Sequence, residues 1–254
     1  MYPELLHLGP VTIYSFGVMA ALALISAALV SWLVLRGRGV PFDFAFELLF
    51  AAGIGGFVGA RIYYLLQHWS EVRGDFWGSA FGGAGFTWYG GLLGGFVAVL
   101  LVARRRRTPA GTVANIMAPP IALGYAVARI GCFLSGDGTY GRPSGLPWAM
   151  AFPHGTVPTS VPVQPTTLYE TATMLVVFAV LYRLASRPQP GWYVFGWFLV
   201  LSGAERFLIE FLRINPRWLL GLTPPQWFAL AGILVGSTIV VRLRARDDRL
   251  SATA

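Results

Sequence analysis

Seven apolar stretches divide this sequence of 254 residues, and each is close to the length of about 20 residues that crosses a bilayer. They are roughly Val11–Leu35, Phe44–Leu66, Phe86–Ala103, Thr112–Leu134, Thr166–Leu184, Trp192–Leu212 and Gln226–Val241. Only 12% of the residues are charged, against roughly a quarter in soluble proteins. The sequence therefore predicts an all-α, polytopic membrane protein with seven transmembrane helices, in which residues 1–254 form a single integral membrane domain.

The arginines between the apolar stretches predict the orientation in the membrane. Twelve of them lie in connections on one side: Arg36, Arg38, Arg104–Arg107, Arg183, Arg187, Arg242, Arg244, Arg246 and Arg249. The other side carries Arg73, Arg142, Arg213 and Arg217. Since cytoplasmic loops are the basic ones, the N-terminus is expected outside and the C-terminus in the cytoplasm. Residues 136–164, between the fourth and fifth stretches, then form a small outer cap.

Composition also limits the partners and cofactors that we expect. The net charge of +8 does not indicate nucleic-acid binding, because the arginines fall between apolar stretches and not on one basic face. Cys132 is the only cysteine, which excludes an internal disulfide and a multi-cysteine metal site. We expect neither a metal nor another cofactor, and the bilayer itself is the first predicted partner.

Charged residues inside the apolar stretches meet, in this topology, in the outer half of the membrane. The three arginines and three carboxylates at this depth are Arg61, Arg129, Arg206, Glu170, Glu205 and Glu210. Ionisable groups in a membrane are costly and usually functional, although any one of them could equally pair for structure or snorkel. Because the whole set shares one depth, and because arginine suits phosphate, the pattern favours a phospholipid of the outer leaflet as ligand.

Six segments, in matching order, resemble those of the bacterial prolipoprotein diacylglyceryl transferases. ARIGCFLSGDGTYGR with LPWAMAFPHG resembles the family signature, which reads roughly GRIGNFxNGExxGR followed by PWAMVFP. The others are TWYGGLLGG, GARIYYLLQHW, QPTTLYE, AERFLIEFLR and LTPPQW. The resemblance implies an enzyme that moves the diacylglyceryl group of phosphatidylglycerol to the lipobox cysteine thiol of a preprolipoprotein signal peptide, releasing glycerol phosphate. It also implies the bacterial cytoplasmic (inner) membrane, with the active site facing the outer leaflet.

The resemblance assigns roles residue by residue. It implies Arg129 and Gly141 for phosphatidylglycerol binding, to which their depth in the membrane adds Arg61 and Glu170. The residues implied for catalysis are Tyr89, Arg206 and Asp137. The chain departs from the family at three places: Tyr89 replaces a histidine, Cys132 an asparagine and Gln164 another histidine. A phenol ionises only at alkaline pH, so Tyr89 is a poor base. No general base for the thiol can be assigned from the sequence.

Two alternatives remain open at this stage. A paralogue of the family would bind the same anionic lipid but modify a different acceptor, or would lack activity. This interpretation stays open because Tyr89 replaces a histidine of the family. A small-molecule membrane transporter would place its polar site near the midplane, often between repeats. The outward bias of the charges and the lack of a visible repeat favour the transferase.

Overall fold

The computed structural model describes residues 2–9, 11–36, 42–74, 76–81 and 87–252. The chain divides into two compact units. The first consists of Met1–Val34 and Ala114–Ala254, and the second of Leu35–Val113.

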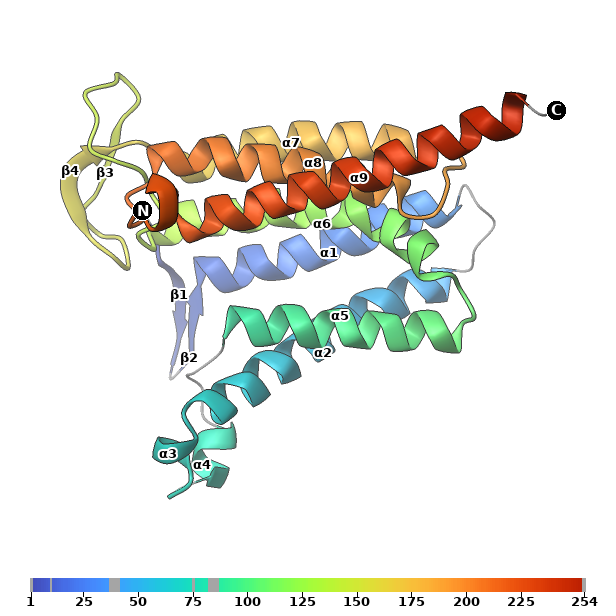
Figure 1. Cartoon of the computed structure of the whole chain (residues 1–254). Coiled ribbons are helices and arrows are strands. Elements are labelled where there is room, and N and C mark those ends of the chain that lie inside the picture. Colours follow the sequence, from blue (N-terminus) through green and yellow to red (C-terminus); the bar gives the residue numbers. More distant parts are fainter. Residues whose placement is uncertain (1, 10, 37–41, 75, 82–86, 253–254) are drawn as a thin grey trace. The chain divides into compact units, whose positions relative to one another are not determined.

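The first unit is a set of long helices that run side by side, with two β-hairpins at one end (Figure 1). Its helices are α1 (Ser15–Arg36), α6 (Ala110–Ser135), α7 (Thr166–Ala185), α8 (Tyr193–Ile209) and α9 (Pro224–Ala252). Two short 3₁₀ turns, η1 (Glu210–Leu212) and η2 (Leu219–Gly221), follow α8. The second unit holds α2 (Phe42–Gln67), α3 (Trp69–Val72), α4 (Phe76–Phe81) and α5 (Trp88–Arg105).

Five helices in the described part of the chain are long and apolar enough to cross a bilayer: α1, α2, α6, α7 and α9. This agrees with an all-α, polytopic membrane protein. The other two predicted spans correspond to α5 and α8, which are helical but have only 18 and 17 residues. The number of seven spans and their orientation stay predictions.

The first predicted span was wrong at its start. Val11–Tyr14 is a strand, β2, that pairs antiparallel with β1 (Glu4–Leu8), and helix α1 begins only at Ser15. The reason is local, because Val11, Thr12 and Ile13 are all β-branched and favour extended backbone over helix.

Glycines allow close approach between α2 and α5 in the second unit. A Cβ atom on Gly59 would lie 2.7 Å from the Cα atom of Gly94, and one on Gly55 would lie 2.7 Å from the Gly94 carbonyl oxygen. No real side chain fits at such distances. Gly55 and Gly59, a GxxxG pair, therefore form a packing surface on α2. Its tightest partners on α5 are Gly90 and Gly94.

Helix α8 is fixed at its start by a side chain from α6. The Asn115 side chain, which is buried, accepts hydrogen bonds from the backbone N–H groups of Val194 (2.9 Å) and Phe195 (3.2 Å). Its amide nitrogen donates to the Pro190 carbonyl at 2.7 Å. Asn115 thus satisfies helix-end donors that no residue at the start of α8 caps. This contact holds α8 in register with α6, so the polar residues near their far ends are placed together.

Segment 136–164 contains the second hairpin, in which β3 (Met150–Phe152) pairs antiparallel with β4 (Thr159–Val163). Tyr140, Phe152 and Val163 form a small core of their own, and Phe133 of α6 packs against it. The segment therefore folds onto the end of the helices where α6 stops and α7 starts (Figure 1). That this end is the outer one stays a prediction.

Candidate active site

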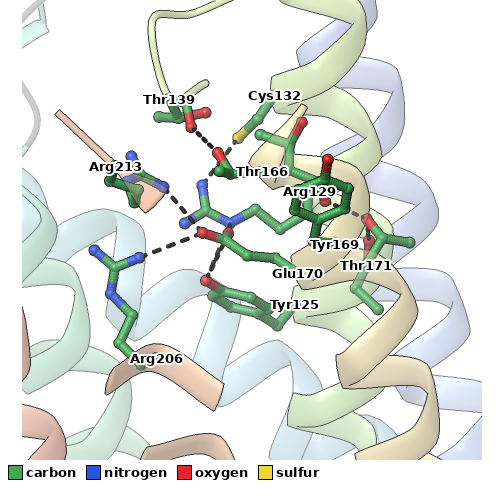
Figure 2. Close-up of polar contacts among 12 residues, drawn as sticks. Tyr125, Arg129, Cys132, Thr139, Thr166, Tyr169, Glu170, Thr171, Arg206 and Arg213 are labelled. Carbon is green, nitrogen blue, oxygen red and sulfur yellow. Dashed lines mark hydrogen bonds and ion pairs between the residues drawn. The ribbon is translucent and has the colours of Figure 1, made fainter. Parts of the chain in front are cut away.

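A single buried carboxylate, Glu170, is the centre of the polar cluster in the first unit (Figure 2). It lies in the first turns of α7 and has no exposed surface. Glu170 forms ion pairs with three arginines: Arg129 of α6 through Oε2, Arg206 of α8 at 3.3 Å and Arg213 at 3.0 Å, both through Oε1. A buried carboxylate is tolerated only with such partners.

Tyr125 connects two members of this cluster. Its hydroxyl donates to Glu170 Oε2 at 3.1 Å and accepts from Arg129 Nε at 3.0 Å. Tyr125 and Arg129 are four residues apart on α6 and therefore share a face. The Arg129 guanidinium also lies over the tyrosine ring, 5.0 Å from its centroid. Arg129 is thereby held in one orientation before any ligand arrives.

A second carboxylate, Glu210, supports the cluster from the end of α8. Glu210 Oε2 lies 2.7 Å from an Arg206 amino group, and Asn215 donates to Glu210 Oε1 at 2.6 Å. Arg206 and Glu210 are four residues apart at the end of α8 and meet on one side of it, whereas Arg213 follows the turn η1 in extended backbone.

The ion pairs of the cluster contain more arginines than carboxylates. Among its described members, three arginines (129, 206 and 213) meet two paired carboxylates (170 and 210). The Arg213 side chain is only 9% exposed, whereas those of Arg129 and Arg206 are 15% and 24% exposed. Arg129 and Arg206 are therefore the cations that an incoming anion can reach. Arg213 lies deeper and neutralises part of the charge environment of Glu170 through its ion pair.

Gly141 holds the chain segment that carries Arg213. Its N–H donates to the Gln164 carbonyl, and the next N–H, of Arg142, donates to the Leu212 carbonyl, both at 2.8 Å. Gly141 also bridges Arg213 in antiparallel fashion. The backbone of Gly141 thus positions the segment that carries Arg213. The predicted role of Gly141 in phosphatidylglycerol binding stays a prediction.

A methyl group at this position should disturb the cluster. In Gly141→Ala the new Cβ would lie 2.6 Å from the Leu212 carbonyl oxygen and 2.7 Å from the Thr166 methyl carbon. We expect a destabilisation of about 1–3 kcal/mol from overpacking and a loss of activity of up to about 10²-fold as Arg213 moves. Thermal unfolding and an activity assay measure the two effects.

Gly145→Ala is the matched control, because a Cβ there meets nothing within 4 Å. Equal behaviour of the two variants would contradict the positioning role of Gly141.

Asp137 lies at the edge of the site. Its Oδ1 accepts hydrogen bonds from the backbone N–H (3.1 Å) and hydroxyl (2.6 Å) of Thr139, and its carboxylate faces the Cys132 thiol. Arg129 approaches the same sulfur at 3.6 Å. Asp137 therefore contacts Arg129 indirectly, through Cys132, and fixes the turn after α6.

Arg61 and Tyr89 belong to the second unit. Arg61 is buried on α2 and donates a hydrogen bond to the Ser79 carbonyl. Tyr89 lies in the first turn of α5, and its side chain is outside the described residues. The predicted participation of these two residues in the site stays a prediction.

An apolar cavity of about 510 Å³ lies beside the start of α7. It is lined by Pro147–Met150, Pro165, Leu168 and Tyr169. Trp148 donates from its indole nitrogen to the Tyr169 hydroxyl at 2.6 Å, which joins the cap to the residue next to Glu170. Among the described residues, no group of three or more His, Cys, Asp or Glu side chains could hold a metal ion.

Comparison with known proteins decides the family. Residues 3–242 match the family described as prolipoprotein diacylglyceryl transferase. The chain belongs to this family. A relative named phosphatidylglycerol–prolipoprotein diacylglyceryl transferase, from Bordetella avium, is 34% identical, over 97% of this chain and 96% of its own. Proteins with the same name are 32% identical in Cupriavidus metallidurans (99% and 97% covered) and 29% in Clostridium tetani (93% and 95%).

Two members of the cluster in this transferase-family chain were not predicted as site residues. Arg213 is one of the arginines that the sequence assigns to the connections, and it lies in extended backbone after η1, so no helical spacing points to it. Tyr125 lies in an apolar stretch, where a tyrosine is ordinarily a packing residue. Its spacing of four from Arg129 was the only available sign.

Proposed function

We propose that this chain transfers the diacylglyceryl group of phosphatidylglycerol to the lipobox cysteine thiol of preprolipoproteins, with glycerol phosphate as the leaving group. The observation that carries the proposal is the exposed side-chain surface of Arg129 and Arg206, which their ion pairs with Glu170 and Glu210 leave open to an anion. Phosphatidylglycerol brings one negative charge on its phosphodiester, and guanidinium groups bind phosphate oxygens through charge-assisted hydrogen bonds.

The cluster also suits the chemistry that follows binding. The bond that breaks joins the phosphate oxygen to the carbon of the diacylglyceryl unit. As it breaks, the departing glycerol phosphate acquires a second negative charge. Fixed cations that face this oxygen stabilise the transition state more than the bound lipid. Arg129 is held by Tyr125 and Glu170, and Arg206 by Glu170 and Glu210, so neither needs to reorganise during the reaction.

Charge polarity supports an active site that faces the outer leaflet of the bacterial cytoplasmic membrane. Glu170 lies near the start of α7, and Arg183 lies in its last turn. Arg244 of α9 donates to the Tyr193 hydroxyl at the start of α8, the end away from Arg206. The cluster and these basic residues thus occupy opposite ends of the first unit. With basic ends in the cytoplasm, the cluster comes to lie outside.

Expression in bacterial cells depleted of their own transferase tests the proposal. We expect lipoprotein precursors to gain the mass of a diacylglyceryl group when this chain is present. Unmodified precursor that accumulates despite good expression in the membrane would overturn the proposed acceptor. Transfer of the same group to another molecule would then identify a paralogue with a different acceptor.

A further inference from the structure

Glu205 is a buried carboxyl beside the cluster that the ion pairs described above do not use. It precedes Arg206 on α8 and is only 8% exposed. Its Oε1 atom is fully buried and has no hydrogen-bond partner. An unsatisfied buried oxygen is uncommon and calls for an explanation.

The neighbours of Glu205 are engaged elsewhere. Its carboxyl faces the charges of Glu170, Arg206 and Arg129, and the hydroxyl of Tyr125 also faces it. The two terminal amino groups of Arg206 bind Glu170 and Glu210.

The Thr173 hydroxyl of α7 also faces the Glu205 carboxyl. The Thr173 hydroxyl donates within its own helix, to the carbonyls of Tyr169 (2.7 Å) and Glu170 (3.2 Å). Glu205 Oε1 thus remains an acceptor without a donor, next to the arginines that would hold phosphate.

We propose that Glu205 accepts the proton of the acceptor thiol. This inference rests on the proposed function and fills the role of general base, which the sequence left unassigned. In the step, the S–H proton passes to a Glu205 carboxylate oxygen while sulfur bonds to the glycerol carbon that carries the phosphate. The bond from that carbon to the phosphate oxygen breaks, and its electron pair leaves with glycerol phosphate.

Charge balance in the cluster favours this assignment. With Glu205 ionised, the three arginines are matched by three carboxylates among the described members. Protonation of Glu205 by the thiol restores one net positive charge. It does so in the same step in which the phosphate gains its second negative charge. Proton transfer and leaving-group stabilisation are thereby coupled through one set of side chains.

The test compares two acceptor peptides, one with the lipobox cysteine and one with selenocysteine in its place. A selenol ionises at lower pH than a thiol, so it needs no base near neutral pH. In Glu205→Gln we expect kcat with the cysteine peptide to fall about 10²- to 10⁴-fold, with KM for phosphatidylglycerol unchanged. With the selenocysteine peptide, the variant should approach the wild-type rate. Glu71→Gln, on α3 of the second unit, is the control that should match wild type with both peptides.

Each outcome decides the proposal. A wild-type rate of Glu205→Gln with the cysteine peptide overturns it, and so does an equal loss with both peptides, since that is a structural effect. Glu205→Asp, which keeps the carboxylate at a shorter reach, should recover part of the cysteine rate and would overturn the proposal by matching Glu205→Gln. If the wild-type chain modifies neither peptide, the proposed function fails and not the assignment of Glu205 alone.

Discussion

Replacing Arg129 with glutamine should reduce diacylglyceryl transfer by about 10²- to 10³-fold, the usual effect of removing one preorganised donor from a developing anion. Arg129 is 15% exposed and is oriented by Tyr125 and Glu170, so it presents its charge to the ligand without rearrangement. We expect KM for phosphatidylglycerol to rise as well, because the same guanidinium binds the phosphate before and during the reaction. Initial rates over a range of phosphatidylglycerol concentrations separate the two effects.

Two further variants sharpen this prediction. Arg129→Lys keeps the charge but loses the forked guanidinium, and should keep only part of the activity. Arg217→Gln removes an exposed arginine of the segment that follows η1 and should behave as wild type. Near-normal activity of Arg129→Gln would contradict a phosphate-binding role for this residue.

The helices and the centre of the site were predictable because both follow from residue type and spacing. The length of the apolar stretches predicted the helices. The positions of Arg129, Arg206 and Glu170 along those helices predicted a shared depth in the membrane, and the structure shows both arginines paired with Glu170. Charge in a membrane is rare enough that each of these residues was a site candidate on its own.

The parts that sequence reasoning missed depend on tertiary contacts. Arg213 enters the cluster because Gly141 and Arg142 pair with the segment 212–213, a pairing of residues some 70 positions apart that no local pattern encodes. The strand Val11–Tyr14 was assigned to a helix because hydropathy alone does not separate a strand from the adjoining helix.

The cluster explains why the same residues serve stability and function. Glu170 is needed because three arginines would repel one another without it, and the arginines are needed because a lone buried carboxylate is costly. The ion pairs leave part of the Arg129 and Arg206 side chains exposed. A phosphate anion can therefore bind there without disturbing the buried pairs.

Glu170→Gln should be the most destabilising single change in the cluster, at about 3–5 kcal/mol, because it leaves buried arginines without their shared carboxylate. Its amide also cannot accept from Arg129, Arg206 and Arg213 as the carboxylate does. We expect a lower midpoint of thermal unfolding in detergent and a loss of transfer activity.

The double variant Glu170→Gln/Arg213→Gln provides the test of mechanism. Arg213 is the least exposed of the three arginines, so removing its charge should return part of the stability that Glu170→Gln loses. Activity should stay low, since Arg129 loses the carboxylate that orients it. If the double variant is destabilised by the full sum of the two single changes, the buried ion pair between Glu170 and Arg213 does not stabilise the first unit.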